Sequence, residues 1–267
     1  MGRIRSQGES ILASSSSIST SSIHTSAKGS IPDEVVLSTQ EFYQAIWEQE
    51  PKVAVFDCDG TLWSPDAGSG FMKWTIDTGL LSKEAAGRLT ARHLEYHQGK
   101  VDEETICGEM VTIYEGISEE DLRASARAYF NEHIEPHLFP ELVSVMQEMQ
   151  AAGVEIWAVS STNDWMIEEA LKGLGVGREK ILAACVEVLR GKATATLRDV
   201  PTGPAKAVSL RRVGIDRPDV VFGNSVHDLA MMEMAKRAFP INPSEGLQKL
   251  AVEKGWPVYY PAAIRPA

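Results

Sequence analysis

The chain has 267 residues, 43% hydrophobic and 24% charged, a balance typical of a protein with a packed core rather than a disordered one. Its net charge of −11 opposes binding to nucleic acid or to an anionic membrane surface. No run of residues approaches the roughly 18 consecutive apolar residues of a membrane-spanning helix, so we expect no membrane insertion. These features favour a soluble, cytoplasmic protein that acts on small molecules.

Residues 1–32 are rich in Ser and Thr, and Glu9 is their only acidic residue. Such a segment cannot bury a core, so we interpret it as a disordered tail. Its Arg3 and Arg5 leave an organelle transit peptide open as an alternative.

From Asp33 onward, short apolar runs alternate with helical periodicity. A helix is predicted over residues 38–48, and the apolar run Val53–Phe56 follows as a strand covered on both faces. Residues 69–140 have apolar residues at helical spacing, interrupted by glycines, and contain no strand pattern. We interpret this segment as a small α-helical cap inserted after the first strand.

The second half of the chain returns to alternating strands and helices. In chain order we predict a helix over 141–152, a strand over 154–159, a helix over 165–174, a hairpin of 181–189 with 193–197, a helix beginning at 202–204, a strand over 220–222, a helix over 228–236 and strands over 238–241 and 258–260. This α/β alternation predicts a Rossmann-like parallel sheet core, built from residues 33–68 and 141–267.

Polar residues stand where the predicted strands end. Asp57, Ser160 and Asn224 each follow a strand, and Lys206 lies near the start of a helix. Because ligands bind beyond the carboxyl ends of the strands in open parallel sheets, we expect these four side chains to converge on one site.

The string Asp57-Cys58-Asp59-Gly60 places two carboxylates one residue apart, where Gly60 lets the chain turn so that both face one phosphate. Asp57 can act as a nucleophile on phosphorus, because a carboxylate needs no base to deprotonate it at neutral pH. Asp59 can then protonate the leaving alcohol and later deprotonate the hydrolytic water.

An anionic nucleophile repels a phosphate dianion, so the site needs positive charge, which Mg²⁺ and Lys206 can supply. Mg²⁺ prefers oxygen ligands. Such ligands are offered by Asp57, by the main-chain carbonyl of Asp59 and by the side chain of Asn224.

The oxygens of a bound phosphate need hydrogen-bond donors. The hydroxyl of Ser160 and the main-chain N–H groups of Ser161 and Thr162 precede a predicted helix, and helix starts favour anions. The turn that contains Gly60 and Thr61 offers further N–H groups. We expect these residues to bind the substrate phosphate.

Taken together, these residues resemble the four ordered motifs of haloacid dehalogenase superfamily hydrolases, here Asp57-x-Asp59-Gly60-Thr61-Leu62, Ser160, Lys206 and Gly223-Asn224-Ser225-x-x-Asp228. The resemblance covers residues 52 to about 242, and the helical insert resembles the cap of the phosphoserine phosphatase-like branch. It implies a Mg²⁺-dependent phosphatase with a phospho-aspartate intermediate on Asp57. It also implies the acid–base role of Asp59 and the phosphate-binding and metal-binding roles given above for the other residues.

The fourth motif departs from the family pattern. It usually begins with Gly-Asp, whereas this chain has Gly223-Asn224, which keeps an oxygen ligand but removes one negative charge. We therefore expect weaker metal binding. Asp228 matches the second carboxylate of the motif and is expected at the metal site, where it orients Lys206 or a metal-bound water.

The expected substrate is a small phosphorylated metabolite. Asp66 falls where phosphoserine phosphatases carry an acid that meets the ammonium group of the substrate, but residues 107–116 contain no basic residue to hold its carboxylate. Trp63 and Trp165, with an acidic cap, suit a cationic head group such as phosphocholine or phosphoethanolamine. The alternative is that these aromatic residues are core packing.

Two other functions remain open. Passing the phosphoryl group to an alcohol instead of water would make the chain a phosphotransferase. Asn224 leaves open a non-catalytic module that binds a phosphate ligand. The sequence does not indicate an oligomeric state.

Overall fold

The computed structural model describes residues 35–264, so the tail predicted at residues 1–32 lies outside the described part of the chain. Six strands form one sheet in the order β4-β3-β2-β1-β5-β6. They are β1 (Val53–Phe56), β2 (Glu155–Asn163), β3 (Ile181–Leu189), β4 (Lys192–Asp199), β5 (Val220–Gly223) and β6 (Arg237–Pro240). All neighbouring strands are parallel except β3 and β4, which are antiparallel. The predicted α/β fold with a Rossmann-like parallel sheet is confirmed.

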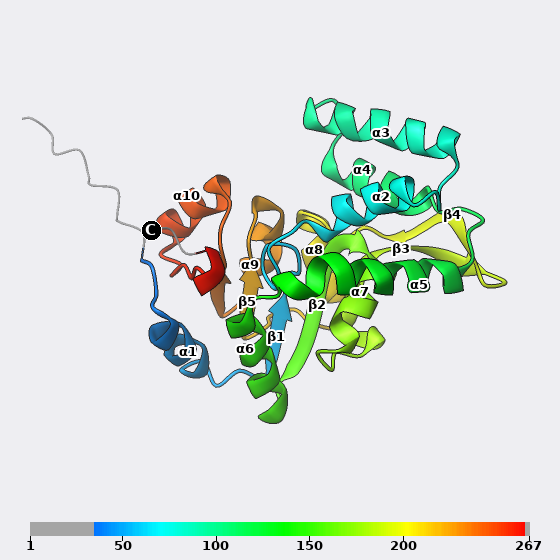
Figure 1. Cartoon of the computed structure of the whole chain (residues 1–267). Helices are drawn as coiled ribbons and strands as arrows, with labels where there is room; N and C mark the ends of the chain where they lie inside the picture. The colour runs from blue at the N-terminus through cyan, green and yellow to red at the C-terminus, as the bar shows by residue number, and fades with distance from the viewer. Residues whose placement is uncertain (1–34, 265–267) are drawn as a thin grey trace, which may run out of the picture. The chain divides into compact units, whose positions relative to one another are not determined.

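Helices cover both faces of this sheet (Figure 1). One face carries α1 (Thr39–Trp47), α6 (Pro140–Ala151) and α7 (Asp164–Lys172), and the other carries α8 (Pro204–Arg212), α9 (Leu229–Met232) and α10 (Glu245–Lys254). In β1, Ala54 and Phe56 pack in the first layer and Val55 packs in the second, all fully buried. Because both faces are covered, β1 is apolar without alternation.

Between β1 and α6 the chain forms four α-helices: α2 (Ala67–Asp77), α3 (Lys83–His97), α4 (Glu103–Thr112) and α5 (Glu119–Tyr129). The glycines that interrupt the helical pattern lie in their connections. Gly79, Gly99 and Gly116 have φ values of 76°, 70° and 83°, a region where other residues are strained. A Ser or Asp side chain then caps the start of each of α3, α4 and α5.

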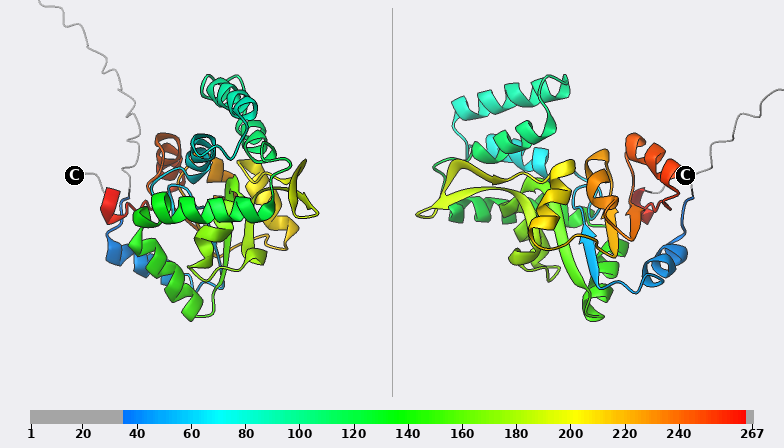
Figure 2. Two further views of the ribbon diagram at one scale, coloured as in Figure 1. Left: turned by 45° about the vertical axis from the view of Figure 1, so that its right-hand side comes forward. Right: turned by 180° about the vertical axis from the view of Figure 1, so that it is seen from behind.

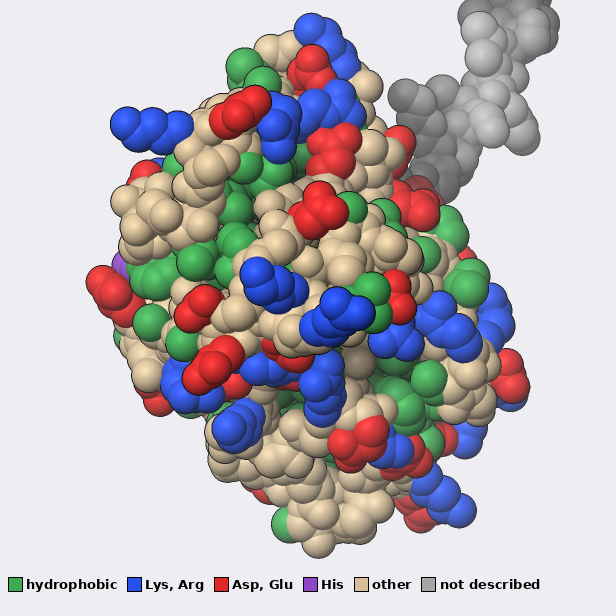
Figure 3. Space-filling view, turned by 90° about the vertical axis from the view of Figure 1, so that its right-hand side faces the viewer, with side chains coloured by type: hydrophobic (Ala, Val, Ile, Leu, Met, Phe, Trp, Pro, Cys, Tyr) green, Lys and Arg blue, Asp and Glu red, His purple; other side chains and the backbone are tan. Residues whose placement is uncertain are grey.

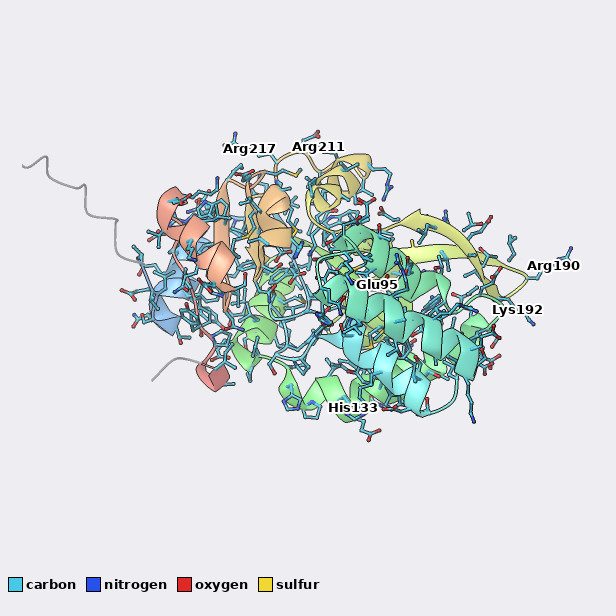
Figure 4. All side chains as sticks on the ribbon, turned by 90° about the horizontal axis from the view of Figure 1, so that it is seen from above. Glu95, His133, Arg190, Lys192, Arg211 and Arg217 are labelled. Carbon is cyan, nitrogen blue, oxygen red and sulfur yellow. The ribbon has the colours of Figure 1, made fainter. Side chains whose placement is uncertain are left out.

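The β3–β4 hairpin extends from the sheet alongside these helices (Figure 2, and Figure 4, where Arg190 and Lys192 mark its tip). The N–H of Gly116 donates to the carbonyl of Ala193 (2.8 Å), and the N–H of Ala193 donates to the carbonyl of Ile117 (3.0 Å). The insert is therefore joined to strands that lie far along the chain, a pairing that its own helical periodicity does not reveal.

Ion pairs join helix α5 of the insert to helix α7 of the core. Arg123 on α5 lies 2.6 Å from Glu168 on α7, and Arg127 lies 2.9 Å from Glu169. Figure 3 views the molecule from the side of the hairpin, where acidic and basic side chains are interspersed. Opposite charges on neighbouring elements account for this mixed surface.

The structure differs from the predicted elements toward the C-terminus. The helix predicted over 228–236 is a 3-10 turn, Val226–Asp228, followed by the four-residue α9, and α10 was not predicted. Residues 258–260 form no strand of the sheet, because Pro257 and Pro261 lack the N–H groups that would extend the pairing. Only isolated bridges, such as that between Ile241 and Tyr259, are made there.

The remaining short helices are a π-helix, Phe130–Ile134, and the 3-10 helices Glu135–His137, Arg178–Lys180 and Ala262–Ile264. Within residues 35–264, no helix combines the length and the apolar character needed to cross a membrane.

Candidate active site

Asp57 follows β1 directly and points to the same side of the sheet as Val55, toward α8. Its side chain is buried, with only 5% of the residue exposed. One carboxylate oxygen accepts a hydrogen bond from Nζ of Lys206 (2.7 Å), and the other accepts one from the hydroxyl of Thr61 (2.8 Å). Both oxygens are thereby held in a fixed orientation.

Lys206 lies in the first turn of α8, after Gly203 (φ 51°) and Pro204 begin the helix. Its ammonium group also donates to Oδ1 of Asp228 (2.6 Å) and to the carbonyl of Val159 (3.1 Å). All three N–H bonds of this buried cation are therefore paired, which is what burial of a charge requires.

Asp228 ties the loop after β5 to this cluster. Its Oδ2 accepts hydrogen bonds from the main-chain N–H groups of Asn224 (2.8 Å) and Ser225 (2.9 Å). The side chain of Asn224 lies against Gly60, where a Cβ would come within 1.8 Å of Nδ2 of the asparagine. Only glycine lets these two loops approach so closely.

Asp59 is oriented by three donors. Its Oδ1 accepts from the indole N–H of Trp63 (2.7 Å) and the main-chain N–H of Ala67 (2.7 Å), and its Oδ2 accepts from the hydroxyl of Thr162 (2.7 Å). Burial, and then the charge of Asp66, raises the pKa of Asp59 to about 6. A carboxyl group with such a pKa can exchange protons near neutral pH.

The acidic groups outnumber the cation between them. Burial, and then the charge of Asp228, raises the pKa of Asp57 to about 7, although Lys206 opposes this effect. Burial disfavours the ammonium of Lys206, but Asp228 and Asp57 outweigh it and raise the pKa of Lys206. Two buried carboxyl groups, those of Asp57 and Asp228, thus share one lysine, a local excess of negative charge.

A divalent cation would balance this excess of negative charge. The oxygen donors beside it, on Asp57, Asp59 and Asn224, are of the kind that Mg²⁺ prefers. Among residues 35–264, no group of three or more His, Cys, Asp and Glu side chains is arranged to hold a metal, so such a site depends on the amide and main-chain oxygens. Asp228 contacts the ammonium of Lys206 but does not line the pocket, which favours its role in orienting Lys206.

A pocket of about 260 Å³ opens over these groups, between the sheet edge and the insert. Eight of the residues predicted from the sequence line it: Asp57, Asp59, Gly60, Asp66, Ser161, Thr162, Lys206 and Asn224. Five others do not: Thr61, Ser160, Asp228, Trp63 and Trp165.

The aromatic residues proposed to face a cationic head group lie elsewhere. Trp63 and Trp165 are buried in the core, and the indole of Trp63 holds Asp59 instead. The core-packing alternative describes both residues, because neither lines the pocket.

The proposed phosphate donors are partly engaged within the protein. The N–H of Gly60 donates to the carbonyl of Trp63 (2.8 Å), and that of Thr61 donates to the carbonyl of Cys58 (3.1 Å). The hydroxyl of Ser160 accepts from the N–H of Thr162 (3.1 Å). These contacts shape the two loops that face the pocket.

Sequence reasoning did not assign most of the other lining residues to the pocket, and the majority of them lie on the insert. They are Ser64, Gly68, Ser69, His93, Tyr96, Glu103, Ile106, Cys107, Met110, Ser225 and His227. Glu103 on α4 joins the insert to the core, because it pairs with His227 and accepts from the hydroxyl of Thr202 (2.9 Å). For the lining residues on α3 and α4, the helical periodicity was the only signal, and it does not identify the face turned to the pocket.

Comparison with known proteins gives this arrangement a family. A histidinol-phosphatase from Neisseria meningitidis serogroup C is 26% identical over 217 residues, which cover 77% of this chain and 97% of that protein. A probable phosphatase from Mycobacterium tuberculosis is 22% identical over 213 residues, covering 77% of this chain and 74% of its own length.

Solved structures share the fold. A protein of unknown function from Bordetella pertussis superposes with a TM-score of 0.69 at 24% identity, covering 78% of this chain and 97% of that one. A substrate-bound phosphoserine phosphatase gives a TM-score of 0.53 at 18% identity, covering 79% and 92%. The family model of haloacid dehalogenase-like hydrolases matches residues 54–233. The chain therefore belongs to the haloacid dehalogenase-like hydrolase family.

Proposed function

We propose that this phosphatase hydrolyses a small phosphate monoester in two steps, with Asp57 as the nucleophile. In the first step an oxygen of Asp57 bonds to phosphorus, the bond from phosphorus to the alcohol oxygen breaks, and Asp59 gives that oxygen a proton. In the second step Asp59 takes a proton from water, the water oxygen bonds to phosphorus, and the aspartyl–phosphate bond breaks.

The observation that carries this proposal is that both carboxyl groups line one pocket while the ammonium of Lys206 contacts Asp57. Lys206 reduces the repulsion between the nucleophile and an incoming phosphate. The raised pKa of Asp59 supports its role as the acid, because a protonated fraction exists when the alcohol leaves.

We further propose that Mg²⁺ binds through Asp57, the main-chain carbonyl of Asp59 and Asn224. When bound there, the ion would neutralise charge on the phosphoryl oxygens. The local excess of buried carboxylates supports this assignment. We infer that the insert, bounded from the sequence at residues 69–140, acts as a cap that selects the leaving group, because it forms the pocket wall facing Asp57.

The name of the Neisseria relative makes histidinol phosphate one candidate substrate. That compound carries an amino group and no carboxylate, and it belongs in any panel of phosphorylated metabolites assayed with this protein.

The test of the nucleophile is the Asp57→Asn variant, assayed for phosphate release with Mg²⁺ present. We expect a loss of at least about 1000-fold in kcat, because the amide cannot form the acyl phosphate. Asp77→Asn is the matched control, since Asp77 lies exposed on α2 and pairs with Lys73. Substantial turnover by folded Asp57→Asn protein would refute the assigned nucleophile.

A further inference from the structure

One carboxylate of the insert bridges two segments of the core. Glu103 is the first residue of α4. One of its oxygens accepts a hydrogen bond from the hydroxyl of Thr202 (2.9 Å), and the other pairs with the imidazole of His227. Thr202 lies just before α8, and His227 lies in the 3-10 turn after β5. Glu103 thus holds together two loops that are remote from it, and from each other, in sequence.

Both of these loops lead to Lys206. The carbonyl of Thr202 accepts the N–H of Ala205 (3.0 Å) in the first turn of α8, and that turn carries Lys206. On the other loop, His227 directly precedes Asp228, which accepts a hydrogen bond from the ammonium of Lys206 (2.6 Å). A shift of either loop would therefore move Lys206 or one of its acceptors.

The side chain of Glu103 is itself held in place. The hydroxyl of Tyr96, on α3, donates to the same oxygen that pairs with His227 (3.2 Å). Burial raises the pKa of Glu103, but the hydrogen bonds with His227 and Thr202 outweigh this effect and lower it, so the carboxylate is ionised near neutral pH. An ionised carboxylate with a fixed orientation is suited to hold donors from two loops.

Glu103 also lines the pocket, so direct contact with the leaving group is the alternative role for it. Its pairing argues against that role. Both oxygens already have partners within the protein, and a turn toward a substrate would break the contacts with both loops. The hydroxyl of Thr202, in a residue that is only 4% exposed, would then lose its acceptor, which is costly for a buried group.

We propose that Glu103 is a positioning residue for the phosphatase reaction. Through Thr202 and His227 it fixes the two core loops, and these loops set the place of Lys206. This assignment rests on the proposed function of the same site. It means that the insert acts on the phosphoryl end of the pocket, where a small displacement of a charge-stabilising group slows the reaction whichever alcohol leaves.

The first test assays variants of Glu103 on p-nitrophenyl phosphate and on ethyl phosphate, with Mg²⁺ present. Glu103→Leu should lower kcat/KM about 10-fold for both substrates. Glu103→Gln keeps groups that can form hydrogen bonds with both loops, so it should lose only about 2- to 3-fold. Glu104→Leu is the matched control, because Glu104 is the next residue of α4, is exposed and lies outside this pocket. It should leave both values unchanged.

The two substrates separate positioning from contact with the leaving group. A loss in Glu103→Leu for one substrate alone would show that Glu103 contacts the leaving group, and would overturn the proposal. Unchanged kcat/KM for both substrates would overturn it as well.

A double-mutant cycle separates positioning from general support of the fold. His227→Leu and Thr202→Val should each lower kcat/KM about 3- to 10-fold in the wild-type protein, but less than about 2-fold when Glu103 is already Leu, because the contact that they remove is then absent. Equal losses in both backgrounds would mean that these residues act independently of Glu103, and the proposal would fail. Glu103→Ala gives the same cycle with a good helix former, should the leucine variant not fold.

Calorimetric titration with inorganic phosphate keeps the proposal separate from the proposed function. Lys206 lines the pocket, so its displacement in Glu103→Leu should weaken phosphate binding about 10-fold. Hydrolysis of p-nitrophenyl phosphate by the wild-type protein, with phosphate binding unchanged in Glu103→Leu, would reject the positioning role alone. Weakened binding in the variant without hydrolysis by the wild-type protein would support the positioning role and reject the phosphatase reaction. A wild-type protein that neither hydrolyses the ester nor binds phosphate would reject both.

Discussion

The two walls of the pocket differ in how completely their polar groups are paired. On the sheet side, the ammonium of Lys206 has three acceptors, and both oxygens of Asp57 and of Asp228 accept hydrogen bonds. On the insert side, the carboxylate of Asp66 has no cationic partner among residues 35–264. The groups proposed to react are therefore held by contacts within the protein, whereas the charge of Asp66 is not balanced by a cation among the described residues.

Burying carboxylates on the sheet side of the pocket costs electrostatic free energy. The pKa of Asp57 and that of Asp59 are both raised, mainly by burial, so the folded protein holds these carboxylates ionised less readily than the unfolded chain does. The carboxylate of Asp66, on the insert side, is exposed to solvent. Substitutions should therefore have their largest effects at the sheet and smaller ones at the insert.

The largest effect is expected for Lys206→Met. Removing the ammonium leaves two buried carboxylates unpaired, so we expect the free energy of unfolding to fall by about 3–5 kcal/mol. The rate of phosphate release should fall about 1000-fold. Urea denaturation and a phosphate-release assay measure the two quantities.

Lys249→Met is the control for Lys206→Met, because Lys249 is exposed and its ion pair in the described part of the chain is with Glu245 on the same helix. If Lys206→Met were as stable and as active as this control, the ion pairs of Lys206 with Asp57 and Asp228 would contribute neither to stability nor to phosphate release.

The sequence predicted the sheet side well, for a physical reason. A buried parallel strand must be apolar throughout, so the first charged residue after it marks the strand end, and β1 occupies the predicted residues Val53–Phe56 before Asp57. Lys206 and Asn224 could be placed near Asp57 because the carboxyl ends of parallel strands share one edge.

The insert side could not be predicted in the same way. His93 and Glu103 lie on helices of the insert, where polar residues usually face solvent. Their orientation depends on how α3 packs on α4 and how α4 packs on the hairpin, and the second packing involves contacts remote in sequence. Trp63 and Trp165 were candidates to face the substrate, but both are buried in the core. A large aromatic side chain gains more free energy from burial in the core than from a position in a solvated pocket.

A smaller effect on the sheet side is expected for Asn224→Asp. The added negative charge lies next to the proposed Mg²⁺ ligands, so the Mg²⁺ concentration for half-maximal activity should fall about 10-fold. Titration of activity with MgCl₂ measures this change. Asn242→Asp, a substitution of the same kind outside the pocket, should leave the titration curve in place. An unchanged curve in Asn224→Asp would contradict the role of Asn224 as a ligand.

The smallest effect is expected when Asp66, on the insert side of the pocket, is made neutral and the pKa of Asp59, on the sheet side, responds. The charge of Asp66 is one cause of the raised pKa of Asp59, so Asp66→Asn should lower that pKa. Asp59 must be protonated to donate, and a lower pKa means that it loses its proton at lower pH. The fall of kcat/KM for ethyl phosphate as the pH rises through about 6 should therefore begin at lower pH in the variant.

At neutral pH this shift corresponds to a reduction in kcat/KM of about 2- to 5-fold, the size expected for the influence of one exposed charge. The substituted side chain keeps an oxygen for the N–H of Ser69, so the start of α2 is retained. p-Nitrophenyl phosphate is the control substrate, because its leaving group departs without a proton and its kcat/KM should not follow Asp59. A pH profile for ethyl phosphate that is the same in both proteins would show that the insert does not tune the acid, and the two walls would then act independently.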